Sequence, residues 1–193
     1  MFAYCGNNPI IRVDDNGQYY TRGQIHDFVV DDICAKNPNK KGSRRNNKII
    51  YSKPVLLSTY GYCDVLDSST GEVWELKRFS DAPSCQFGVA HLQLSNYVNN
   101  GYLENDPKKT LVFGGTNTKI SPNVFTKTDS DGKGQYVIGY WDTGLGVLFY
   151  DYLYIPSGDE VSVGVAALII AGLAGYAGVV GIGAGAGVLI PAV

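Results

Sequence analysis

The feature that most constrains the fold is a pair of strand-like stretches, residues 62–67 and 72–78, joined by the turn-forming run Ser-Ser-Thr-Gly. Before this predicted hairpin, apolar residues at helical spacing predict a helix over 21–36, and the same spacing returns over 85–99. Further strands are expected over residues 49–59, with Pro54 favouring an edge or a break, and over 110–113, 136–141 and 146–155. The order α-β-β-β-α-β with added C-terminal strands predicts an α/β (α+β) fold.

The overall charge gives no general electrostatic case for binding nucleic acid. The chain has 16 Lys and Arg against 18 Asp and Glu, a formal net charge of -2, so such binding needs a local patch. One basic cluster stands out, consisting of Lys40, Lys41, Arg44, Arg45 and Lys48. Contact with a nucleic-acid backbone and a solvated loop are both open interpretations of it. Four scattered cysteines without a C-x-x-C pair argue against a structural zinc site.

The predicted hairpin places three chemically capable side chains near one another. Asp64 lies at the start of its first arm, while Glu75 and Lys77 lie on its second arm, one residue apart. Alternate side chains of a strand share a face, so Glu75 and Lys77 should point the same way, with Asp64 folded back beside them. Two carboxylates hold a hard cation such as Mg²⁺, and a nearby lysine stabilises negative charge developing on a phosphate. Phosphodiester cleavage is therefore predicted; an exposed structural hairpin with a salt bridge is the alternative.

The run YCDVLDSSTGEVWELK, residues 62–77, resembles the motif of the PD-(D/E)XK nuclease superfamily. A similar sequence occurs in nuclease toxins at the ends of RHS-type proteins. The resemblance implies a restriction-endonuclease-like core, with Asp64 and Glu75 as metal ligands and Lys77 as the catalytic lysine. It also implies the Leu76 carbonyl as an additional ligand and Mg²⁺ as the cofactor, with Mn²⁺ as a substitute.

The second predicted helix carries a Q-x-x-x-Y pattern, Gln93 to Tyr97, which resembles the extra motif of RecB-like members of this superfamily. Its spacing puts both residues on one helical face, together with Gln86, Val89 and Ala90. The resemblance implies that Gln93 hydrogen-bonds a catalytic residue or the substrate strand, and it makes Tyr97 a weaker candidate.

The first predicted helix carries two further candidates, His26 and Asp32. Related toxins often have a histidine near the position of His26, and nucleases of the superfamily often have an acidic residue on this helix. Asp32 falls within the apolar arc of the helix, where a carboxylate needs a partner such as a metal ion or Lys77. A partly exposed side chain without a role is the favoured alternative for both residues.

Residues 1–20 resemble the end of the core domain of RHS/YD-repeat proteins, where a variable toxin begins. The matching residues are Tyr4, Asn7, Asn8, Pro9, Val13, Asp14 and Gly17, while Asp15 replaces the usual proline and puts self-cleavage there in question. The resemblance implies that Met1 is an internal start and that the chain is the end of a larger exported bacterial protein. No signal peptide is recognised at Met1.

Residues 161–193 contain no charged side chain and are long enough as a helix to cross a membrane. Small residues repeat through this stretch at spacings of three and four, which permits close helix contact in lipid. Membrane association of a 159–193 tail is therefore expected, with a disordered or self-burying segment as the alternative.

Together these features predict a polymorphic-toxin nuclease domain over residues 21–158 that hydrolyses DNA, with RNA as the alternative substrate. The resemblance implies secretion or delivery with the parent protein, action in the cytoplasm of a competitor cell and a cognate immunity protein as partner. Two rivals are a toxin that damages membranes through the tail and an inert fragment of an RHS-type surface protein.

Overall fold

The computed structural model describes residues 20–42, 47–81 and 83–157, and Leu168, Ile170 and Gly172 of the C-terminal stretch. The RHS-like segment and most of the charge-free tail therefore lie outside the described residues, and the predictions made for them remain predictions. No helix among the described residues is both long and apolar enough to span a membrane.

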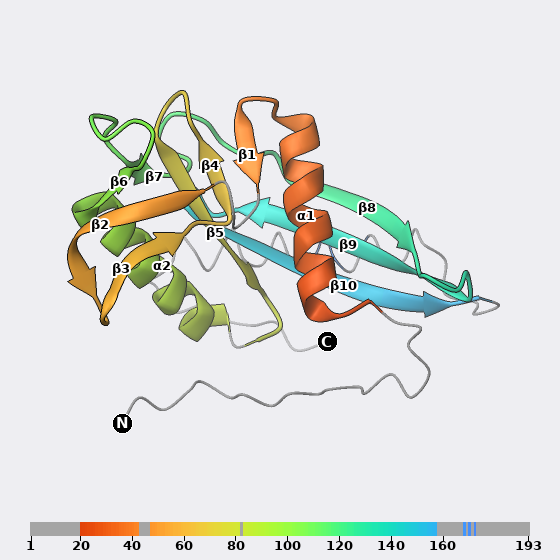
Figure 1. Ribbon diagram of the computed structural model, residues 1–193. Helices are drawn as coiled ribbons and strands as arrows, with labels where there is room; N and C mark the ends of the chain where they lie inside the picture. The colour runs from red at the N-terminus through yellow and green to blue at the C-terminus, as the bar shows by residue number, and fades with distance from the viewer. Residues whose placement is uncertain are drawn as a thin grey trace.

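The described chain is a mixed α/β protein with helices and strands in two sheets (Figure 1). In chain order the elements are α1 (Arg22–Lys36), β1 (Lys40–Gly42), β2 (Lys48–Val55), β3 (Ser58–Tyr62), β4 (Val65–Asp67), β5 (Glu72–Arg78), α2 (Pro83–Asn100), β6 (Gly101–Leu103), β7 (Val112–Phe113), β8 (Asn123–Thr128), β9 (Gly134–Asp142) and β10 (Val147–Pro156).

The larger sheet has the strand order β1-β4-β5-β10-β9-β8, and the smaller one has the order β3-β2-β6. Within the larger sheet β10 and the short β7 run parallel to β5, whereas the other described pairs are antiparallel. Between β5 and β7 the chain passes through α2 and then β6 of the smaller sheet, so β5 and β7 are joined by a parallel crossover that contains α2. β5 thus lies between the hairpin partner β4 and the parallel strands that follow α2.

Both predicted helices are confirmed, and their ends have clear local causes. α1 begins at a capping box in which Thr21 and Gln24 bond each other's backbone amides. Its apolar residues Ile25, Val29 and Ile33 are fully buried against the larger sheet. α2 packs on β5 and on the smaller sheet, and its buried residues belong to a second core cluster. Residues of β5 alternate between these two cores.

The single strand predicted over residues 49–59 is wrong, because the chain forms a hairpin there. β2 and β3 are joined at Leu56 and Leu57, which both adopt positive φ (48° and 68°), a conformation that sequence rules expect of glycine or asparagine. Pro54 lies in an irregular part of β2 where the register shifts, which agrees with the expected break. The short strands β1 and β6 and the longer β8 were not predicted.

Candidate active site

The site forms where β4 begins, because one edge of β5 beyond that point has no strand partner among the described residues. β4 pairs only with Glu72–Trp74 of β5. Asp64 directly precedes β4, and its amide donates a hydrogen bond to the Trp74 carbonyl at 3.1 Å. Its side-chain Oδ2 accepts a hydrogen bond from the Leu76 amide at 2.8 Å. A carboxylate therefore takes the place of a backbone acceptor at this edge. Because the N–H and C=O of one strand residue face the same edge, the Leu76 carbonyl also faces it.

Glu75 and Lys77 share the β5 face that looks towards α2, as the alternation predicted, while Trp74 and Leu76 pack into the α1 core. The Lys77 Nζ lies 3.3 Å from the Glu75 Oε2. Glu75 is only 2% exposed, and its second oxygen, Oε1, has no hydrogen-bond partner in the described structure. A buried acceptor without a donor is costly, so this oxygen indicates a missing positive partner.

The two carboxyl groups titrate in opposite directions. Burial and the neighbouring Asp64 raise the pKa of Glu75 to about 8, although Lys77 acts against this. Burial alone would also raise the pKa of Asp64, but the hydrogen bond and charge of His26, with Lys77 and the Leu76 amide, lower it below its usual value. Without a cation the pair therefore tends to hold one negative charge on Asp64.

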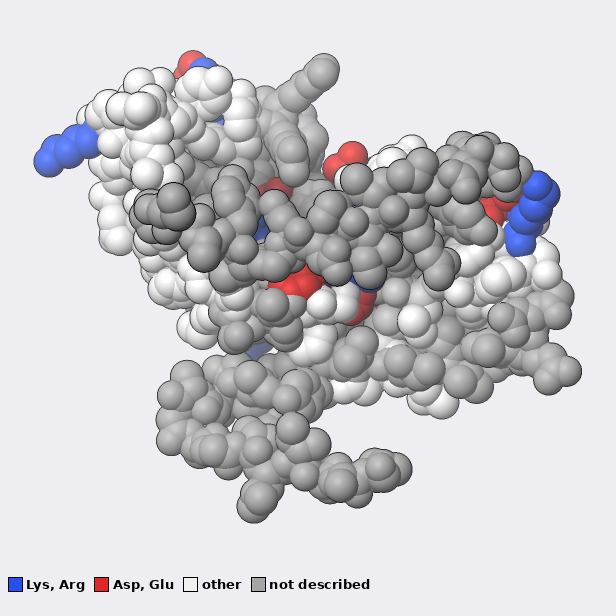
Figure 2. All heavy atoms as spheres, turned by 90° about the horizontal axis from the view of Figure 1, so that it is seen from below, with Lys and Arg blue, Asp and Glu red and all other residues white. Residues whose placement is uncertain are grey.

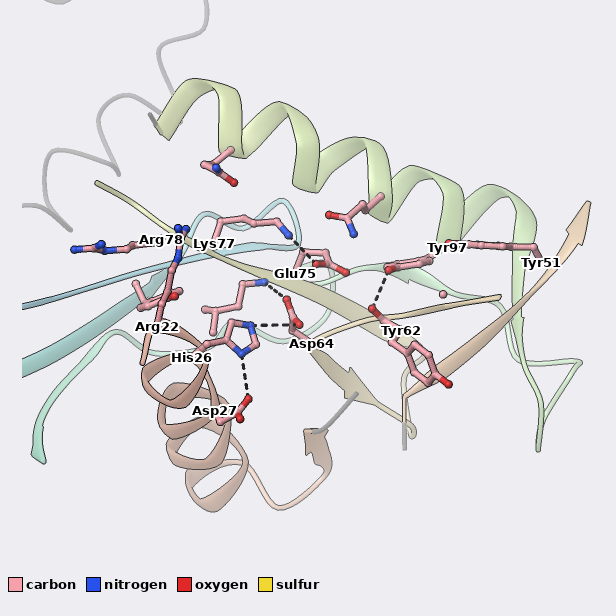
Figure 3. Close-up of a pocket in the computed structure, with 16 residues that line it drawn as sticks. Arg22, His26, Asp27, Tyr51, Tyr62, Asp64, Glu75, Lys77, Arg78 and Tyr97 are labelled. Carbon is pink, nitrogen blue, oxygen red and sulfur yellow. Dashed lines mark hydrogen bonds and ion pairs between the residues drawn. The ribbon is translucent and has the colours of Figure 1, made fainter. Parts of the chain in front are cut away.

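α1 contributes the histidine that the sequence singled out. The His26 Nε2 lies 3.3 Å from the Asp64 Oδ1, and its Nδ1 lies 3.5 Å from the Asp27 Oδ1 (Figure 3). Only 14% of the His26 side chain is exposed, so the ring is held between the two carboxylates. The histidine is thus part of the cluster, and its neighbour Asp27 is a member that sequence reasoning missed.

These side chains line a cavity of about 750 Å³. Its walls come from α1, β2, β3, β5, β10 and α2 and consist of Arg22, Gly23, His26, Asp27, Tyr51, Gly61, Tyr62, Asp64, Glu75, Leu76, Lys77, Arg78, Gln86, Gln93, Tyr97 and Tyr150. Figure 3 shows the labelled arginines on one side of the two carboxylates and the labelled tyrosines on the other.

The predicted helical face of α2 is confirmed in part: Gln86, Gln93 and Tyr97 line the cavity and Ala90 is buried, whereas Val89 is 48% exposed. Tyr97 is buried, and its hydroxyl donates to the Tyr62 carbonyl at 2.9 Å, so it ties β3 to α2. This contact gives Tyr97 a positioning role. Gln93 lies on the cavity wall.

Sequence reasoning missed the two arginines of the cavity. Arg22 forms an ion pair with Asp81, and the Arg78 Nε lies 3.2 Å from the Asp151 Oδ1. The Arg78 guanidinium also stacks over the Tyr152 ring at 4.3 Å. Arg78 follows Lys77 directly, but no sequence pattern indicated that the start of α1 would bring Arg22 to the same place.

Two predicted residues lie elsewhere and must be reassigned. Asp32 has partners on its own side of the sheet, the Lys36 Nζ at 2.8 Å and the Tyr140 hydroxyl at 2.8 Å, and it does not line the cavity. Lys40 has only 4% of its side chain exposed; it pairs with Asp67 at 3.4 Å and lies over the Trp74 ring. A lysine buried by β1 pairing cannot bind a nucleic-acid backbone, so its assignment to the basic cluster was wrong.

The other members of the basic cluster are only partly described. Arg44 and Arg45 lie outside the described residues, as does the side chain of Lys41. Lys48 is one-third exposed, lies over the Tyr60 ring at 5.1 Å and pairs with Glu104 at 3.4 Å. Figure 2 shows prominent basic side chains at the left and right margins of the face that it draws.

The side chains present fit a hard cation held by a few oxygen ligands. No group of three or more His, Cys, Asp or Glu in the described ranges is arranged to hold a metal. Mg²⁺ needs fewer protein ligands, because it keeps several waters and shares its coordination with substrate phosphates. Asp64, the unpartnered Glu75 oxygen and the Leu76 carbonyl at one open strand edge supply this kind of donor set.

Comparison of the chain with protein-family models, curated proteins and solved structures finds no match. The functional argument therefore depends on the residues and their geometry.

Proposed function

We propose that this protein is a metal-dependent nuclease whose centre consists of Asp64, Glu75 and Lys77. The single observation that carries the proposal is the Glu75 carboxylate, which lines the cavity and is buried beside Asp64, with its Oε1 oxygen unpartnered among the described residues. A purely structural glutamate would have its acceptors satisfied. The hairpin, the crossover through α2 and the parallel β7 also support a restriction-endonuclease-like arrangement of the core.

Asp64, Glu75 and the Leu76 carbonyl would hold Mg²⁺, with Mn²⁺ as a substitute. When bound, the cation neutralises phosphate charge and acidifies a water molecule. Lys77 reaches the same place from the next position on its face and stabilises negative charge on the phosphate oxygens. His26 holds Asp64 in position from the α1 side, and Gln93 orients the substrate strand from the α2 side.

The biological setting follows from the sequence resemblances alone. We propose that the chain is the toxic end of an RHS-type exported protein and that it cuts DNA, or alternatively RNA, in the cytoplasm of a competitor cell. A producing cell then needs an immunity protein that binds and blocks this domain.

The proposal is tested with the purified full chain on plasmid DNA, circular single-stranded DNA and total RNA. Mg²⁺ should support cleavage of at least one of them, and EDTA should abolish it. Lys77→Ala should lower the rate by about 100-fold or more, because it removes a charge aimed at the phosphate. Lys133→Ala, which changes an exposed lysine paired with Asp131, is the matched control and should leave the rate unchanged. Full activity of Glu75→Ala, or in EDTA, would contradict the proposal.

The membrane-acting alternative depends on the charge-free stretch 161–193. A peptide of that stretch should then release dye from vesicles made of anionic and neutral lipids. Leakage by the peptide, combined with no loss of nucleic acid in the presence of the full chain, would favour the alternative over the nuclease.

A further inference from the structure

The depth of the two carboxylates limits the kind of substrate that reaches them. Glu75 is 2% exposed and Asp64 is 7% exposed. They lie on the floor of a cavity whose walls include the first turns of α1 on one side and Gln86 and Gln93 of α2 on the other. A cavity of about 750 Å³ has the size of a small-molecule pocket, not of a groove that holds a double helix.

One end of this cavity carries two arginines, Arg22 and Arg78, which are paired with Asp81 and Asp151. Arg22 keeps 56% of its side chain exposed while Asp81 orients it, and Arg78 is held by Asp151 and by the face of Tyr152. Arginines fixed in this way present their remaining N–H donors in a constant direction, which suits a phosphate. A backbone phosphate next to the scissile one would therefore lie at this end.

The other end is aromatic. Tyr62 lines the cavity and turns its carbonyl towards Tyr97, while its ring, which is 37% exposed, turns away from Tyr97 (Figure 3) and packs edge-to-face on Tyr60, 5.5 Å away between centroids. Tyr60 is 45% exposed and has the Lys48 ammonium over its ring. Exposed rings next to a cation are typical of surfaces on which successive unpaired bases stack while the backbone meets the charge.

We propose that the site takes an unpaired nucleic-acid strand, with a base stacked on Tyr62 and the backbone bound by Arg22 and Arg78 at the opposite end. The inference rests on the proposed nuclease function and deepens it. In a duplex the bases are stacked on each other and paired, so they offer Tyr62 no free face. An unpaired strand of DNA or RNA offers both a free base and a narrow backbone that reaches the buried carboxylates.

The test measures binding and cleavage by the full chain with three probes of one sequence. These are a 15-nucleotide DNA strand, the same strand as RNA and the corresponding 15-base-pair DNA duplex. Binding is followed by fluorescence anisotropy in Ca²⁺ and cleavage in Mg²⁺. We expect at least one single strand to bind about tenfold more tightly than the duplex and to be cut faster; the two single-strand arms decide between DNA and RNA.

Variants on two separate elements make the inference specific. Tyr62→Ala should weaken single-strand binding about 5- to 100-fold, whereas Tyr62→Phe, which keeps the ring, should bind within twofold of the parent. Arg22→Gln should reduce the salt dependence of single-strand binding by about 0.7 in the log–log slope, because one phosphate contact is lost. Lys133→Gln, a change of an exposed cation outside the cavity, should not alter this slope.

The possible outcomes of these experiments test the single-strand preference separately from the proposed nuclease function. Equal binding and cleavage of the duplex, or normal single-strand binding by Tyr62→Ala, would overturn the inference and leave the nuclease intact. Failure to cut any of the three probes in Mg²⁺, together with no cleavage of plasmid or total RNA, would instead remove the nuclease itself.

Discussion

At the scale of single residues, Glu75 is placed where the proposed function needs a carboxylate but where burying a carboxylate lowers the stability of the fold. Its carboxyl group is buried next to Asp64, and only Lys77 among the described residues offers it a nearby positive charge. The neighbouring Glu72 shows the contrast: it is fully buried, yet it accepts bonds from the Asn117 and Thr118 amides, and these outweigh burial and lower its pKa. Glu72 is thus a structural acid in the same strand, and Glu75 is the unsatisfied one.

The titration of Glu75 predicts how the metal-free protein responds to pH. An acid whose folded-state pKa is raised from 4.5 to about 8 favours folding most below pH 4.5, and that contribution is lost as the pH rises towards 8. In EDTA, Glu75→Gln should therefore be more stable than the parent by about 2 kcal/mol at pH 9, with little difference at pH 4. Urea unfolding at both pH values measures this.

The matched control for this stability change is Glu104→Gln. The Glu104 side chain is 59% exposed, so this substitution should change the free energy of unfolding by less than about 0.5 kcal/mol. An equal loss of stability in Glu75→Gln at both pH values would show that the Glu75 carboxylate supports the fold.

At the scale of elements, the late start of β4 at Val65 creates the site. If β4 were long enough to pair with the whole of β5, its backbone groups would occupy the edge of β5 that now holds the Asp64 carboxylate. α1 and α2 then approach this open edge from the two faces of the sheet and supply His26 and Gln93. Strand length, rather than any one motif, therefore gives the carboxylates access to a cavity.

A second contact between elements lies on β9, where Gly139 faces Ile170 of the C-terminal stretch. A Cβ at Gly139 would overlap the Ile170 side chain, which is only 1% exposed. Gly139→Ala should therefore cost about 1–3 kcal/mol by overpacking, and Ile170→Ala about 2–4 kcal/mol by leaving a cavity. The double variant should cost at least about 1 kcal/mol less than the sum, as measured by thermal or urea unfolding.

Gly88→Ala serves as the control for the Gly139 cycle, since Gly88 lies in α2 with open space where its Cβ would be, and alanine there should stabilise the helix. Additive costs for Gly139 and Ile170 would contradict the predicted contact.

At the scale of the whole molecule, the proposed activity should act inside a cell and not at its membrane. Expression of the full chain in a bacterium should fragment chromosomal DNA, or degrade RNA if that is the substrate, before the membrane potential falls. Lys77→Ala should restore growth by several orders of magnitude in viable count, because the chain loses its charge next to Glu75 but keeps its apolar tail. Gel analysis of nucleic acid and a potential-sensitive dye show whether nucleic acid is degraded before or after the membrane potential falls.

Toxicity that persists in Lys77→Ala, with early loss of membrane potential, would instead assign the damage to the stretch 161–193. Lys133→Ala should be as toxic as the parent, and this control excludes a general effect of losing one lysine.

The sequence by itself determined the features that depend on local backbone geometry. The two-residue period of a strand placed Glu75 and Lys77 on one face, and the helical period placed Gln86, Gln93 and Tyr97 on one side of α2. Both periods repeat within a few residues, so no distant contact was needed to predict them.

The tertiary structure alone decided which distant elements meet. It brought Arg22 and His26 to the edge of β5, gave Asp32 its partners on β8 and β9, and buried the Lys40 side chain beside Asp67 and the Trp74 ring. None of these contacts follows from periodicity, because each depends on where sheet pairing stops and on how helices cross the sheet. Those choices are made by the burial of the two cores, to which residues far apart in the chain contribute together.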